Sequence, residues 1–123
     1  MVNPNRRKAT TVLSESVQGR NIRVPASATE NTLVHDVPDG EIHEITIYAA
    51  NPSTSANEVN GFWGGTNEED DILNFSMPAE STRPALIRDG VLVGPASIQL
   101  RAKTGDVFVF GKVIVYEDHG PAA

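Results

Sequence analysis

Two histidines, His35 and His43, come nearest to a chemical site in this 123-residue sequence. They lie on either side of the turn at Pro38, so we expect them on adjacent strands, close enough to approach each other. With Asp36 or Glu44 beside them they would form a weak metal site, because a bound metal needs three or four convergent ligands. The sequence therefore favours surface polar groups near a turn, with no bound metal.

A run of four carboxylates, Glu68, Glu69, Asp70 and Asp71, is the second candidate. Calcium favours clustered carboxylates, but this run lacks the alternating spacing and the glycine of an EF-hand loop. Consecutive side chains in an extended loop also point in opposite directions, so a solvated loop is the preferred interpretation. The sequence contains no nucleophile elbow and no glycine-rich phosphate loop. We expect neither enzymatic activity nor a cofactor.

The sequence has one pair of adjacent aromatic residues, at 62–65, where Phe and Trp precede two glycines. Trp63 could stack on a sugar ring, and Tyr48 is the only evident second aromatic for such a platform. A single Trp at a strand end is more often a packing residue. A carbohydrate-binding module that uses Trp63 and Tyr48 for ligand stacking therefore remains an alternative.

Short apolar stretches separated by turn residues run from residue 33 to residue 117, and none has helical spacing. Two stretches alternate cleanly between apolar and polar positions: Ile45, Ile47 and Ala49 in the first, and Ile98, Leu100 and Ala102 in the second. The pattern predicts an all-β sandwich. Strands are expected at 31–37, 42–50, 56–63, 72–77, 97–103 and 106–117, with a hairpin formed by 85–88 and 91–93 around Asp89-Gly90.

The last predicted strand, 106–117, is apolar on both faces, unlike the others. Such a strand must be covered on both sides, whereas a two-sheet sandwich covers only one. The second face would then meet the N-terminal segment or another subunit. Alternatively, a bulge at Gly111 shifts the register, so that each half points its apolar side chains inward. If the second face is instead covered by another subunit, the sequence predicts an oligomer interface at Phe108, Phe110, Ile114 and Tyr116.

The sequence divides into an N-terminal arm (1–30), a sandwich domain (31–118) and a short tail (119–123). The arm is polar, and Pro25 restricts its second extended piece to a sheet edge or an arm. The alternative is an ordinary first strand of the same sandwich. The first eight residues carry three basic and no acidic side chains, whereas residues 9–123 have a net charge of −9. The acidic body disfavours nucleic acid as a partner, and no apolar run is long enough to span a membrane.

The layout of the body resembles that of a known class of proteins. Residues 32–41 (TLVHDVPDGE) and 45–51 (ITIYAAN) form a Val-Pro-x-Gly turn and a strand that ends in Asn. Residues 77–82 (MPAEST) provide a Pro-x-x-Ser hairpin, and 98–106 (IQLRAKTGD) a closing strand and turn. This layout, over residues 32 to 117, resembles small all-β structural proteins of tailed bacteriophages, of the head decoration (cement) type. The segment 94–96, Gly-Pro-Ala, departs from the acidic or polar loop usual there.

The resemblance implies a jelly-roll-like sandwich without enzymatic activity, assembled as a homo-oligomer, most commonly a trimer. It implies a place on the capsid exterior of a virion, where the chain stabilises the shell, with the major capsid protein as partner. A tail or fibre component is the alternative within the class. The expected capsid contacts lie in the arm, at Arg6, Arg7, Lys8, Ile22 and Val24.

Overall fold

The computed structural model describes residues 5–67 and 71–118, which form nine β-strands and no helix. The strands are β1 (Asn5–Val12), β2 (Ile22–Val24), β3 (Thr32–Val37), β4 (Glu41–Asn51), β5 (Asn57–Gly64), β6 (Ile72–Met77), β7 (Ser81–Val93), β8 (Ala96–Ala102) and β9 (Val107–Asp118). In this part of the chain no helix exists that could cross a membrane. The all-β prediction is confirmed.

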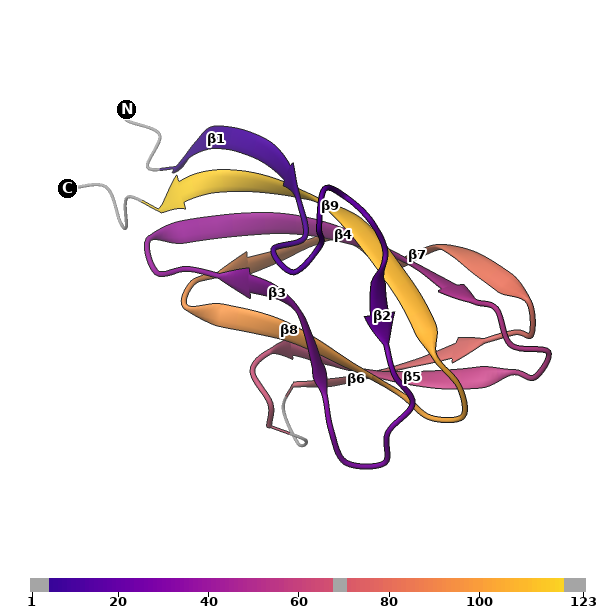
Figure 1. Ribbon diagram of the computed structural model, residues 1–123. Helices are drawn as coiled ribbons and strands as arrows, with labels where there is room; N and C mark the ends of the chain where they lie inside the picture. The colour runs from indigo at the N-terminus through magenta and orange to yellow at the C-terminus, as the bar shows by residue number, and fades with distance from the viewer. Residues whose placement is uncertain (1–4, 68–70, 119–123) are drawn as a thin grey trace.

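The strands form two antiparallel sheets that face each other (Figure 1). Sheet A has the order β1-β9-β4-β7, with β2 pairing to the same strand β9, and sheet B has the order β3-β8-β5-β6. The N-terminal strand β1 runs beside the C-terminal strand β9, so Asn5 lies opposite Asp118. On the opposite side of the sandwich, β7 and β6 are the edge strands of their sheets.

The core lies between the two sheets and follows the period-two pattern of the sequence. Ile45, Ile47 and Ala49 point inward from β4, as predicted, and every second residue of β8 does the same. The buried core cluster contains Leu13, Val24, Val34, Val37, Ile45, Ile47, Ala49, Val59, Met77, Ile98, Leu100, Ala102, Val107, Val109, Val113 and Val115.

Strand β9 passes Gly111 without a bulge. Its pairing with β4 is continuous, from Glu41 opposite Glu117 to Ala50 opposite Phe108. The apolar odd-numbered residues of both halves are therefore buried in the core, and the even-numbered ones project from the other face. The bulge interpretation was wrong. Gly111 serves a different purpose, because a Cβ at this position would meet the carbonyl oxygen of Thr46 and lie 3.2 Å from Leu13 Cδ2.

The N-terminal segment belongs to the sandwich, which revises the expected boundary at residue 30. β1 pairs with β9 from Asn5 to Val12, and β2 pairs with β9 at Val107–Val109. The segment then crosses to sheet B, where Ala26 bridges to Ala102. Leu13 and Val24 are both fully buried. This apolar burial explains why a polar segment folds back onto its own subunit, the alternative that the sequence had left open.

A charged clamp fixes the second half of this segment. The guanidinium of Arg23 lies 2.7 Å from Asp106 Oδ2, and the backbone N–H of Ala26 donates to Oδ1 of the same carboxylate. The Ala26 N–H and the Arg23 side chain hold the pKa of Asp106 below its usual value.

The expected hairpin around Asp89-Gly90 is instead a single long strand. β4 pairs with both halves of β7, since Ile45 lies opposite Gly90 and Ile47 opposite Ile87. The register shifts between these two pairs, and Asp89 has a φ of 53°. The Asp-Gly pair therefore forms a β-bulge. Such a bulge can require a positive φ, as a hairpin turn does. Thr46 fixes the bulge, because its Oγ1 accepts a hydrogen bond from the Asp89 N–H.

Candidate functional site

The outer face of sheet A carries a row of apolar side chains. Phe108, Phe110, Ile114 and Tyr116 alternate with the core residues of β9 and are absent from the core cluster. Tyr48 lies opposite Phe110 on β4, and the two rings stack with centroids 5.1 Å apart. The structure thus places the four predicted interface residues together on one face, which a sandwich of two sheets leaves uncovered. We call these five residues the outer row.

The edge strand β7 extends the apolar character of this face. Val91 and Val93 lie opposite Glu44 and Ile42, so they share the outer face with them. Their exposed fractions, 57% and 54%, are high for apolar side chains. Contiguous exposed apolar surface of this kind marks interaction sites. The polar groups of the face include Glu44, which accepts a hydrogen bond from the hydroxyl of Tyr116.

Trp63 and Tyr48 do not form a shared platform. Trp63 packs against the core between the sheets, where a Cβ on Gly90 of sheet A would lie 2.6 Å from its ring. Tyr48 points to the outside of sheet A and stacks on Phe110. The two predicted ligand-stacking residues therefore lie on opposite sides of a sheet, and Trp63 acts in packing.

The fold places the five expected capsid-contact residues in different environments. Val24 is fully buried and Ile22 packs against the core, so neither offers a docking surface. Arg6, Arg7 and Lys8 all lie in β1, where the backbones of Arg6 and Arg7 pair with Glu117 and Tyr116 of β9. The side chains of these three basic residues lie outside the described part of the structure. Three carboxylates of the candidate calcium site, Glu68, Glu69 and Asp70, also lie outside the described residues. The tail from residue 119 lies outside them too.

The two histidines meet, but in the interior. His35 and His43 are 1% and 4% exposed, and His35 Nε2 lies 2.7 Å from His43 Nδ1. The expectation of surface groups was wrong, because His43 has the same parity on its strand as Ile45 and Ile47. That signal was present in the sequence. Burial, followed by the electrostatic effect of the neighbouring His43 ring, lowers the pKa of His35 to about 4. The described residues hold no group of three or more side chains suited to a metal ion.

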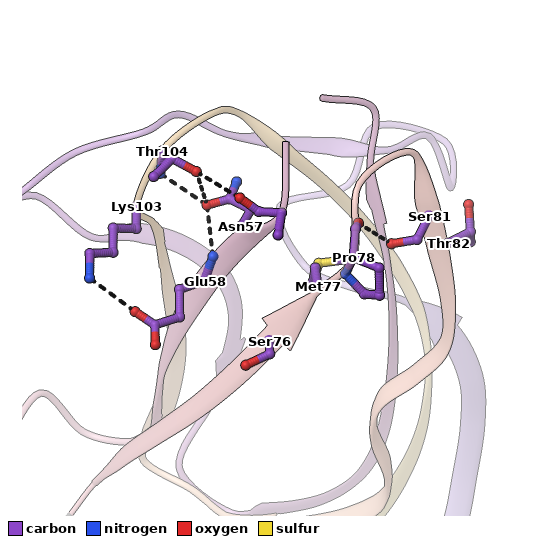
Figure 2. Close-up of a pocket in the computed structure, with 10 residues that line it drawn as sticks. Asn57, Glu58, Ser76, Met77, Pro78, Ser81, Thr82, Lys103 and Thr104 are labelled. Atoms are coloured by element: carbon purple, nitrogen blue, oxygen red, sulfur yellow. Dashed lines mark hydrogen bonds and ion pairs between the residues drawn. The ribbon is translucent and has the colours of Figure 1, made fainter. Parts of the chain in front are cut away.

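A groove of about 780 Å³ lies at one end of the sandwich, between the β5–β6 pair and the start of β7 (Figure 2). Met77 and Pro78 line it from one side, and Asn57 and Thr104 from another. In the described part of the chain, every buried side-chain nitrogen or oxygen has a hydrogen-bond partner. The groove therefore has a shape that could hold a ligand but no unsatisfied buried group to orient one.

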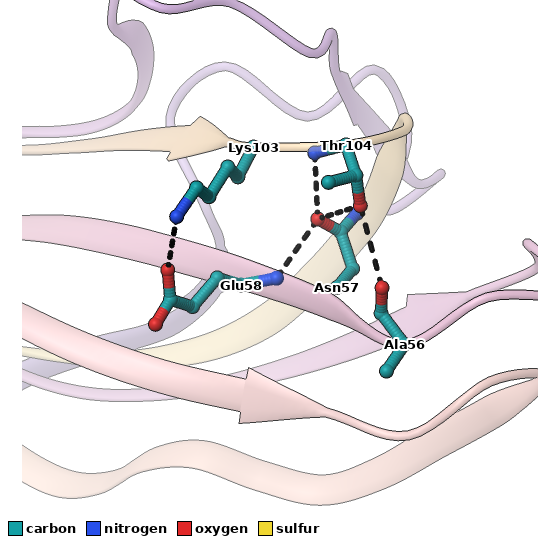
Figure 3. A network of polar contacts seen from close by, with 5 residues as sticks. All are labelled: Ala56, Asn57, Glu58, Lys103 and Thr104. Carbon is teal, nitrogen blue, oxygen red and sulfur yellow. Dashed lines mark hydrogen bonds and ion pairs between the residues drawn. The ribbon is translucent and has the colours of Figure 1, made fainter.

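Asn57 is an example of a side chain whose polar atoms all have hydrogen-bond partners (Figure 3). Its Oδ1 accepts hydrogen bonds from the backbone N–H groups of Glu58 and Thr104, at 2.8 and 2.9 Å. Its Nδ2 donates to the carbonyl of Gly105, also at 2.8 Å. Nearby, Lys103 Nζ lies 3.2 Å from Glu58 Oε2 in an exposed pair, visible in Figure 3. These contacts lock the β8–β9 turn onto β5, so Asn57 is a structural residue.

Comparison with known proteins supports the fold alone. No protein-family model matches the chain, and no curated protein matches its sequence. Among solved structures, the chain is similar to one from the work "Bacillus endospore appendages form a novel family of disulfide-linked pili". The TM-score is 0.53 at 7% sequence identity, over 98% of this chain and 96% of the other. At so low an identity the comparison shows a shared fold, over nearly the full length of both chains, and nothing further.

Proposed function

We propose that the protein is a non-enzymatic structural subunit that associates with copies of itself and decorates the exterior of a phage capsid. The observation that supports this proposal is the outer row, Tyr48, Phe108, Phe110, Ile114 and Tyr116, on a face that its own fold leaves uncovered. A trimer joined through this face would cover the row. The basic start of β1 would then contribute a salt-dependent attraction to an acidic shell.

A second candidate is a subunit of a protein filament. The similarity to a pilus chain over nearly the full length of both proteins favours it. These 123 residues contain no cysteine, so they cannot form disulfide links between subunits. Filament growth would have to rest on non-covalent contacts, for which the same outer row is available.

Light scattering at about 50 μM tests self-association. The wild type should form an oligomer, and Phe110→Glu should form a monomer, because a carboxylate would be buried in the interface. Leu73→Glu is the matched control, since Leu73 is 37% exposed on sheet B and Phe110 is 38% exposed on sheet A. A monomeric wild type, or equal effects of both substitutions, would contradict the proposed interface.

Immunogold electron microscopy of lysates from producing cells tests the location. Gold on capsid surfaces supports the decoration role, whereas gold along filaments supports the second candidate. Label on tails would favour the tail or fibre alternative. A glycan array tests the carbohydrate alternative, for which the structure offers no Trp63–Tyr48 platform.

A further inference from the structure

Three hydrogen bonds in series connect the segment after β1 to the start of β4 through the buried histidines. The backbone N–H of Ser14 donates to His35 Nδ1 at 2.9 Å. His35 Nε2 lies 2.7 Å from His43 Nδ1, and His43 Nε2 lies 2.7 Å from Glu41 Oε1. We call this series the histidine latch. It joins three elements that are distant in the sequence or separated by a turn.

The direction of each hydrogen bond is determined. A backbone amide can only donate, so Nδ1 of His35 is unprotonated and this neutral ring carries its proton on Nε2. That proton is donated to Nδ1 of His43. The second ring therefore carries its own proton on Nε2 and donates it to the Glu41 carboxylate. Both histidines are neutral when all three hydrogen bonds are intact.

The two rings of the latch have no position for an additional proton. A proton on Nδ1 of His35 would face the N–H of Ser14. A proton on Nδ1 of His43 would face the Nε2–H of His35, unless that ring moved its own proton to Nδ1 and again opposed Ser14. Every protonation of a ring therefore removes one hydrogen bond. The Ser14 bond is the one that can open outward, because Ser14 is exposed and both rings are buried.

The surroundings of the histidines would accept the added charge once the latch opens. A cavity of about 510 Å³ borders both rings and is lined by carboxylates from three elements, Glu15 after β1, Asp36 of β3 and Glu41 of β4. β9 contributes the apolar Val115, and its Glu117 lies opposite Glu41 in the sheet. Among the described residues lining this cavity, the charged groups other than the histidines are all acidic.

We propose that the histidine latch is an acid-sensitive switch that holds the largely exposed segment 14–21 against β3 and β4 at neutral pH and releases it on protonation, while Leu13 stays buried in the core. Besides the latch, the segment is tied to β3 where the Asp36 N–H donates to Ser14 Oγ at 2.8 Å and the Glu15 N–H donates to the Val34 carbonyl at 3.4 Å. The inference stands independently of the proposed function. Since the pKa of His35 is lowered to about 4 from 6.5, release is expected between these pH values.

Hydrogen exchange of the intact protein tests the switch. We expect the protection factor of the Ser14 amide to fall at least tenfold between pH 7.5 and pH 4.5, while amides in the β4–β9 pairing stay protected. His35→Asn should abolish this pH response, because Asn Oδ1 can still accept from Ser14 but does not titrate. His119→Gln is the control, since it removes a histidine that is not part of the latch.

Nitrogen-15 spectra of the wild-type imidazoles provide a second test that needs no variant. At pH 7.5 both latch histidines should be neutral and carry the proton on Nε2. A proton on Nδ1 of His35 would overturn the inference. An unchanged Ser14 protection factor at pH 4.5, or a full pH response in a folded His35→Asn variant, would do the same.

Discussion

Leu13 occupies the space that a side chain at Gly111 would need. Its Cδ2 would lie 3.2 Å from a Cβ at position 111, and the Thr46 carbonyl oxygen closes the site from the backbone side. Between β1 and β2, which pair with the same edge of β9, the chain therefore inserts an apolar side chain into the core. The N-terminal segment and the centre of β9 fit each other through this pair.

Gly111→Ala should destabilise the protein by about 1–3 kcal/mol, the usual range for overpacking a tight site. The nearest obstacle is backbone, which cannot rotate away as a side chain does. Urea denaturation measures the change. Gly105→Ala is the control, because the nearest atoms to its added Cβ are 3.8 Å away. Equal midpoints for Gly111→Ala and the wild type would refute the proposed fit.

Leu13→Ala should cost about 2–5 kcal/mol, since it leaves a cavity in the core. Val17→Ala removes a neighbouring side chain that is 69% exposed, so it should change stability by less than about 0.5 kcal/mol. Deletion of residues 2–20 should consequently unfold the protein. A truncated protein with the wild-type melting temperature would return this segment to the status of a separate arm.

Trp63→Ala should lower the free energy of unfolding by roughly 2–4 kcal/mol, because Trp63 packs against the core and against Gly90. The outer row should be unaffected, so self-association of the folded fraction should persist. Calorimetry and light scattering on the same sample separate the two effects. Unchanged stability together with a lost glycan affinity would instead favour the carbohydrate-binding alternative.

Stability should fall as the pH decreases from 6.5 to about 4. The pKa of His35 is about 4 in the folded protein and 6.5 as its ordinary value, so the unfolded chain binds more protons in this window. Each pKa unit corresponds to about 1.4 kcal/mol, which makes the contribution of His35 about 3 kcal/mol when fully expressed. Urea midpoints at pH 7, 5.5 and 4 measure it. His35→Asn should flatten this dependence, and an identical slope in that variant would contradict the prediction.

The strands of the body could be predicted because their apolar residues alternate, as in 97–103, where the predicted inward residues are all fully buried. The sequence predicted the contact between His35 and His43 but not its depth, because the parity of His43 with Ile45 was not applied to a polar residue. It also predicted a hairpin at Asp89-Gly90, since a bulge and a hairpin turn need the same backbone conformation. Strand 31–37 shows a third limit: Leu33 and Val37 alternate as inward residues would, but a register shift in β3 leaves Leu33 37% exposed and buries Val34.

The N-terminal segment was the hardest part to predict. Its two buried residues, Leu13 and Val24, are isolated in a polar stretch, so no local pattern indicates that they belong to the core. Leu13 is buried beside Gly111, almost one hundred positions away, and Val24 is buried where β2 pairs with the last strand. Such long-range complementarity cannot be read from the composition of a short window.

The antiparallel pairing of β1 with β9 determines how the protein responds to mechanical load. Because Asn5 lies opposite Asp118, a force that pulls the two ends apart acts on one end of this ladder. The hydrogen bonds between the two strands then break one after another, as in the opening of a zipper, and each step needs little force. A force applied parallel to the strands would have to break them together. If the protein assembles as proposed, we therefore expect the contacts that bear tension to lie on the faces of the sandwich, with no load on the ends of β1 and β9.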